Sequence, residues 1–133
     1  MKNILAFGDS LTWGFVAGKD ARHPFETRWP NVLATGLGGK ARLIEEGQNG
    51  RTTVFDDETT FESRNGSVAL PLLLISHQPL DLVIIMLGTN DIKFAARCRA
   101  FGMEVVGFDP DADVATAFVV LQRIHDAIDA GAS

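Results

Sequence analysis

The chain has 133 residues, of which 46% are hydrophobic and 22% are charged, a composition typical of one globular domain that buries a core. Its formal net charge of −5 and pI near 5.0 argue against binding to nucleic acid or an anionic membrane through a broad basic surface, so we expect small-molecule partners. The single Cys98 allows no internal disulfide, the first residues lack the apolar segment of a signal peptide, and no apolar run approaches the roughly 18 residues of a membrane span. We therefore expect a single domain over residues 1–133, located in the cytoplasm.

Short apolar runs alternate with helical patterns along the chain, which predicts parallel strands joined by crossover helices. The run from Leu82 to Leu87 is apolar on both faces and predicts a central strand. Ser67 is the candidate N-cap of a helix in which Pro71 is tolerated only within the first turn. The predicted strands are residues 4–7, 41–45, 80–87 and 104–108, and the predicted helices are residues 10–16, 28–37, 67–76, 92–101 and a last one from about 109 to Gly131.

Polar clusters follow three of the predicted strands. The first contains Ser10, the second contains Gly50, and the third contains Asn90. Right-handed crossovers bring the carboxyl ends of parallel strands to one edge, so we expect the clusters to face a common site. A hydroxyl nucleophile, a backbone N–H of a glycine and a side-chain amide form a set suited to acyl transfer, in which each donor to the oxyanion contributes about 3 kcal/mol.

The same clusters carry a family resemblance. They resemble the conserved blocks of the SGNH, or GDSL, hydrolases, and most closely those of the bacterial arylesterase and acyltransferase branch. The resemblance covers about residues 3–94. It rests on Phe7-Gly8-Asp9-Ser10-Leu11-Thr12-Trp13-Gly14, Arg22-His23-Pro24, Arg28-Trp29-Pro30, Glu45-Glu46-Gly47, Arg51-Thr52-Thr53 and Asp81-Leu82-Val83-Ile84-Ile85-Met86-Leu87-Gly88-Thr89-Asn90-Asp91.

The resemblance implies a flavodoxin-like α/β/α sandwich with a parallel sheet, and an esterase that acts on small esters without metal or cofactor. Ser10 would be the nucleophile. Its own N–H, the Gly50 N–H and the Asn90 side chain would form the oxyanion hole, and Asp9 would organise the turn. Members of this branch are often oligomeric and can transfer the acyl group to an alcohol or peroxide, so we expect a homo-oligomer and keep water, alcohol and peroxide as possible acceptors.

The general base is not assigned by the sequence. The family takes it from an Asp-x-x-His block near the end of a longer domain, and the only such spacing here, Asp20 to His23, precedes the second block. His77 precedes a strand and is expected at the edge opposite Ser10. His125 is expected on a helix, where its neighbour Asp126 cannot face it. We therefore expect none of the three histidines to serve, and a base from a partner subunit stays an alternative.

Two functions from different classes remain open. The first is an ester hydrolase or acyltransferase that uses Ser10, and the second is a shortened or divergent SGNH domain that binds or assembles without turnover. Trp13 and Phe15 are expected as core or pocket wall, and Arg51 as part of an ion pair. The scattered carboxylates of a polar loop are expected to be solvated rather than to hold a metal ion; they are Asp56, Asp57, Glu58 and Glu62.

Overall fold

The computed structural model describes residues 1–57 and 59–93. They fall into two compact units, one made of residues 1–51 and 77–87 and the other, within the described range, of 52–57, 59–76 and 88–93. No helix in this part of the chain is long and apolar enough to cross a membrane. The predicted strand at 104–108 and the last predicted helix lie outside the described residues, as does nearly all of the helix predicted at 92–101.

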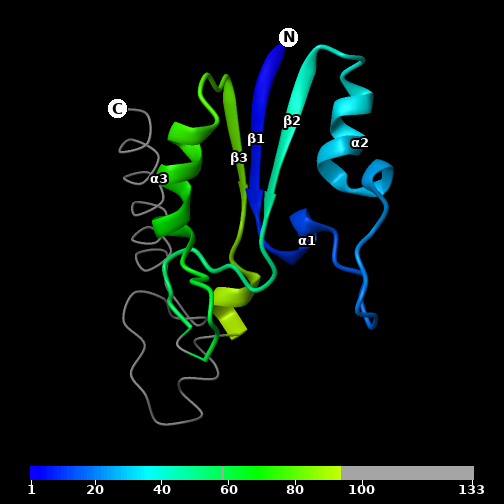
Figure 1. Ribbon diagram of the computed structural model, residues 1–133. Coiled ribbons are helices and arrows are strands. Elements are labelled where there is room, and N and C mark those ends of the chain that lie inside the picture. Colours follow the sequence, from blue (N-terminus) through cyan, green and yellow to red (C-terminus); the bar gives the residue numbers. More distant parts are fainter. Residues whose placement is uncertain (58, 94–133) are drawn as a thin grey trace. The chain divides into compact units, whose positions relative to one another are not determined.

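The first unit is built on a parallel sheet of three described strands, shown in Figure 1. They are β1 (Lys2–Gly8), β2 (Ala41–Gly47) and β3 (Leu82–Met86), in the order β2-β1-β3. Within this described sheet β1 pairs with strands on both sides, whereas β3 pairs with β1 alone; a central position for β3 stays a prediction that depends on residues outside the described range. The burial agrees with this order: residues 4–7 of β1 are buried, whereas Leu82 in β3 is 52% exposed.

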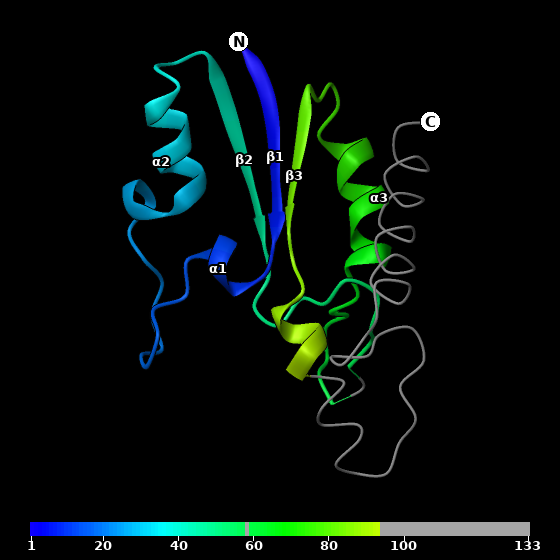
Figure 2. The same ribbon diagram turned by 180° about the vertical axis from the view of Figure 1, so that it is seen from behind.

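Two helices of this unit pack against β2, and Figure 2 shows the same arrangement from behind. The first, α1 (Ser10–Trp13), begins two residues after β1, and α2 (Trp29–Gly36) follows a single 3₁₀ turn at Phe25–Thr27. Pro30 sits in the first turn of α2, where its missing N–H costs nothing. The helix α1 is shorter than the predicted range 10–16, because Gly14 takes a left-handed conformation and ends it.

The second unit contains α3 (Gly66–Ser76). Its N-terminus is capped two positions earlier than predicted: the Asn65 side-chain oxygen accepts the Ser67 N–H at 3.0 Å and the Ser67 hydroxyl at 2.6 Å. Pro71 lies inside the helix, so the prediction that this proline is tolerated only within the first turn is wrong. Burial of Leu70 and Leu74 accounts for the tolerated proline, since tertiary packing supplies most of the stability of a protein helix.

Candidate active site

The three strands of the first unit end at one level. Gly8 is paired with Gly47 on one side and with Met86 on the other. The turn after β2 is also tied to the end of β1, because Gln48 donates its N–H to the Gly8 carbonyl at 3.2 Å. The segments that follow β1 and β2 therefore lie together, at the end of the sheet marked by the arrowheads in Figure 1.

Ser10 is the first residue of α1, and the residue before it shapes the turn. Asp9 is 2% exposed; its carboxylate accepts the Leu11 N–H at 3.0 Å, and its backbone carbonyl accepts from Thr12 and Trp13. The N–H groups of the first helical turn have no partner within the helix itself, so those of Leu11 and Thr12 are satisfied by Asp9. Among the described residues, no group accepts the Ser10 N–H or forms a hydrogen bond with its hydroxyl. The turn thus presents a half-buried serine together with an uncommitted amide donor.

Gly47 lets β2 and α1 approach each other closely. A Cβ placed on Gly47 would lie within 3.0 Å of the Trp13 N, the Trp13 Cα and the Thr12 carbonyl carbon, all of which are backbone atoms. The third residue after it, Gly50, has φ of 81°, a conformation that side chains disfavour. No group among the described residues accepts the Gly50 N–H. The first unit therefore holds two uncommitted amide donors, on turns that follow neighbouring strands.

Arg51 stabilises the turn that follows β2. Its Nη1 donates to the Gly8 carbonyl at 3.1 Å and to the Glu46 carbonyl at 2.7 Å, and its guanidinium carbon lies 4.2 Å from the centre of the Phe7 ring. Burial lowers the pKa of Arg51 from its ordinary value, and the charges of Glu46 and Asp9 partly offset that effect. These contacts show a cation held by backbone carbonyls, with two carboxylates near enough to act on its charge.

Asn90 belongs to the second unit, in a helical segment at residues 89–93 that follows β3 in sequence. This segment begins three residues earlier than the helix predicted from residue 92, and its first bond runs from the Ile92 N–H to the Gly88 carbonyl at 3.3 Å. Asn90 is half-buried. Its neighbour Asp91 has a fully buried carboxylate that accepts the Thr53 N–H at 3.0 Å and the Thr53 hydroxyl at 2.5 Å. The sequence carried no signal for this pair, because its members are 38 positions apart.

Within the described residues, neither His23 nor His77 forms a hydrogen bond with Ser10. His23 lies in an exposed loop, where its backbone N–H donates to the Gly14 carbonyl at 2.6 Å. The side chain of His77 reaches the penultimate residue of β2, with its Nε2 2.8 Å from Glu46 Oε1. The expectation that His77 lies at the edge opposite Ser10 rested on its place in the chain before β3, whereas its imidazole reaches a residue near the carboxyl end of β2. His125 lies outside the described residues.

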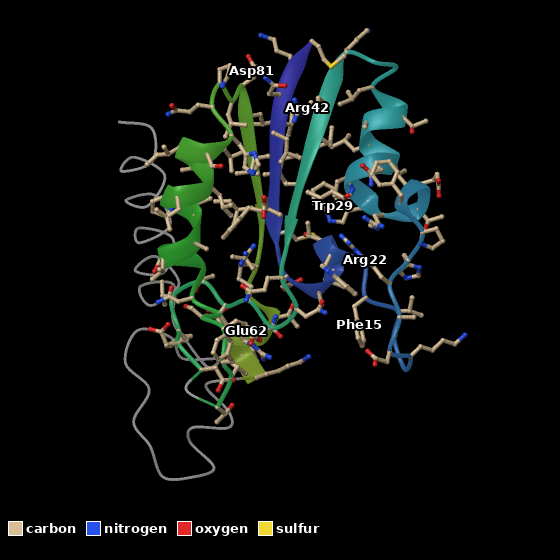
Figure 3. All side chains as sticks on the ribbon, in the orientation of Figure 1. Phe15, Arg22, Trp29, Arg42, Glu62 and Asp81 are labelled. Carbon is tan, nitrogen blue, oxygen red and sulfur yellow. The ribbon has the colours of Figure 1, made fainter. Side chains whose placement is uncertain are left out.

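The loop after α1 folds back on that helix, as the labelled Phe15 and Arg22 in Figure 3 show. These two residues form an antiparallel bridge, and the Arg22 guanidinium carbon lies 4.7 Å from the centre of the Trp13 ring. Phe15 remains 42% exposed. Trp13 therefore packs beneath an arginine on the first unit, and Phe15 is available at its surface.

The polar loop of the second unit uses its acidic residues in local contacts. Asp57 accepts from Thr59, Asp56 accepts from Ser63, and Arg64 lies near Asp57 and Glu62. Across residues 1–57 and 59–93, no three His, Cys, Asp or Glu side chains are grouped so that they could hold a metal ion.

A profile of the GDSL-like lipase/acylhydrolase family matches residues 6–131, which is most of the chain. The chain belongs to this family. A comparison with curated proteins found no match. Several solved structures are similar to this GDSL-like chain. A carbohydrate acetylesterase family member from Sinorhizobium meliloti is 42% identical, with a TM-score of 0.77 over 97% of this chain and 54% of the other. The inhibitor-bound aryl esterase of M. smegmatis is 41% identical, with a TM-score of 0.73 over 93% and 54%.

These matches confirm the predicted family and fold class for the GDSL-like chain. The parallel sheet and its flanking helices superpose on hydrolases with the SGNH fold at well above 25% identity. This chain spans about half the length of those two structures, since it covers 54% of each.

Proposed function

We propose that this GDSL-like protein is a serine esterase that cleaves small acyl esters through an acyl-enzyme on Ser10. The observation that carries the proposal is the pair of uncommitted N–H groups of Ser10 and Gly50, on turns that follow the paired strands β1 and β2. Two amide donors that need no rearrangement are what a developing oxyanion requires. The family match and the esterases among the similar structures support the same chemistry.

In the proposed reaction, Ser10 Oγ attacks the ester carbonyl while a base accepts the hydroxyl proton. The carbonyl oxygen becomes an oxyanion that accepts hydrogen bonds from the Ser10 and Gly50 N–H groups and from the Asn90 side-chain amide. The C–O bond to the alcohol then breaks, and the base returns the proton to the leaving oxygen. Water, an alcohol or a peroxide attacks the acyl-enzyme to complete the cycle. Asp9 acts indirectly, since it occupies the Leu11 N–H and leaves the Ser10 N–H available.

The proposed reaction also requires a general base for Ser10. Losing this base lowers the rate by a factor on the order of 10⁴ to 10⁶. Because neither His23 nor His77 forms a hydrogen bond with Ser10 in the described part of the chain, we propose a second copy of the chain as one source of the base. In that case the specific activity falls on dilution. The proposed substrate is a short acyl ester of a carbohydrate or a phenol, which the names of the similar structures suggest.

Hydrolysis of 4-nitrophenyl acetate by the purified chain tests the proposal. We expect turnover that Ser10→Ala abolishes and that the control Ser63→Ala, in an exposed loop, leaves unchanged. Turnover that survives Ser10→Ala would refute the role of Ser10. No turnover at any protein concentration would refute the enzymatic function and favour a domain that binds or assembles without catalysis.

A further inference from the structure

Asp91 in the second unit is a buried ionisable group with no part in the chemistry proposed above. Its side chain is fully buried, and Thr53 donates its N–H to both carboxylate oxygens, at 3.0 Å to Oδ1 and 3.2 Å to Oδ2. The Thr53 hydroxyl donates to the same Oδ1 at 2.5 Å. Burying a carboxylate is costly unless hydrogen bonds replace its water, so this set of donors indicates a fixed geometry rather than an incidental contact.

Thr53 is itself held in place. Its carbonyl accepts the Ser67 N–H at 2.8 Å, in the first turn of α3. The neighbouring Thr52 bridges to Asn65, and its hydroxyl donates at 2.6 Å to the Phe55 carbonyl. Residues 52–55 are all buried. Asp91 is therefore attached to a segment that is anchored at several points, and not to a mobile loop.

The attachment bears directly on the orientation of Asn90. Asp91 follows Asn90 on the helical segment 89–93, and successive side chains on a helix point about 100° apart. Fixing Asp91 inward therefore fixes the direction in which Asn90 leaves the same turn.

We infer that Asp91 and Thr53 are positioning residues for Asn90, and that their contact sets the rotation of the helical turn that presents the Asn90 amide. The inference rests on the proposed function, in which that amide stabilises the oxyanion. A displacement of about 1 Å in such a group can cost a hundredfold in rate.

Thr53→Val tests the inference, because it removes the hydroxyl with little change of volume and keeps the backbone N–H. We expect kcat for 4-nitrophenyl acetate to fall roughly tenfold to hundredfold with KM changed less than twofold. Thr53→Ser restores the hydroxyl and should restore kcat. Thr59→Val is the matched control, since the Thr59 hydroxyl also donates at 2.5 Å to an aspartate, Asp57, but in an exposed turn.

A second measurement separates this inference from the proposed function. The side-chain amide of Asn90 gives a pair of ¹H–¹⁵N signals, assigned by their loss in Asn90→Ala. We expect these signals to move or broaden in Thr53→Val and to stay in place in Thr59→Val and Thr53→Ser. If the wild-type chain shows no turnover, the proposed function fails, and these signals still decide whether Thr53 and Asp91 hold Asn90.

Two results would overturn the inference. The first is a Thr53→Val protein whose Asn90 signals and kcat both match those of Thr59→Val. The second is a protein whose Asn90 signals move while kcat stays constant, because the orientation would then have no catalytic consequence. Asp91→Asn is a supporting variant, chosen over Asp91→Ala because it keeps an acceptor for Thr53 in the buried site; it should move the same signals as Thr53→Val.

Discussion

Gly47→Ala adds one methyl group where β2 and α1 meet. That methyl would lie within 3.0 Å of three backbone atoms of Thr12 and Trp13, whereas non-bonded carbon atoms are separated by about 3.5–4.0 Å. Backbone atoms cannot rotate away as the end of a side chain can. The variant must therefore push α1 away from β2 by several tenths of an ångström or more.

The size of the effect follows from this overlap. Overpacking of this kind costs about 1–3 kcal/mol of folding free energy. Because Ser10 is the first residue of α1, the same displacement moves the proposed nucleophile relative to the Gly50 turn, and a shift near 1 Å can lower the rate about a hundredfold. We therefore expect Gly47→Ala to lose stability and, in the protein that remains folded, reactivity at Ser10.

Urea unfolding, followed by tryptophan fluorescence, measures the first effect through the midpoint at constant slope. Gly36→Ala is the matched control: nothing lies within 4 Å of a Cβ built there, so this helical position should be neutral or gain about 0.4–1 kcal/mol. A Gly47→Ala midpoint equal to that of wild type would show that β2 and α1 do not meet as described, and would refute the reasoning.

Two further predictions concern the first unit. Trp29→Phe leaves the fully buried Thr12 hydroxyl without the Trp29 Nε1 donor at 3.1 Å, and should cost about 1–3 kcal/mol; less coupling than about 0.5 kcal/mol in a double-mutant cycle with Thr12→Val would contradict it. The Asn3 N–H, at 2.8 Å, and the Lys2 ammonium lower the pKa of Asp81. A carboxyl whose folded-state pKa is depressed adds stability above its unfolded value of about 3.9, and this is lost as pH falls. The midpoint temperature should thus fall further between pH 5 and pH 2.5 in wild type than in Asp81→Asn, and equal falls would refute the assignment.

The sequence predicted the first unit well where local signals agree. The run Ile4–Phe7 is too short for a helix and ends at Gly8, and the structure has a buried strand there. The two glycines and the asparagine of residues 47–50 predicted a tight turn, and the structure has one there, closed by the Arg51 N–H and the Gln48 carbonyl at 3.1 Å. Such features depend on a few adjacent residues, so they can be read without knowledge of the fold.

The failures all involve competition between local preference and distant packing. Ser67 and Asn65 are both good caps, and only the register of α3 decides between them. Pro71 argues for a helix boundary, but the burial of Leu70 and Leu74 outweighs the lost bond.

The candidate site divides in the same way. Ser10, Gly50 and Asn90 could be proposed because each follows a strand in a short polar block, and the roles assigned to them stay predictions. The contact of Asp91 with Thr53 could not, because a pair so far apart in sequence becomes visible only in the folded chain. The general base also stays unassigned by the described contacts.

The most direct test of the central claim is to map where a fluorophosphonate reacts. The Ser10 oxygen displaces fluoride from phosphorus, and the adduct is located by mass spectrometry of the digested protein. The proposed site predicts one adduct, on Ser10, that is absent in Ser10→Ala and forms at least tenfold more slowly in Asn90→Ala, in line with the loss of about 10²-fold or more for a missing oxyanion donor. An adduct on another residue, or no adduct on Ser10 in the folded chain, would contradict the claim that Ser10 is an activated nucleophile.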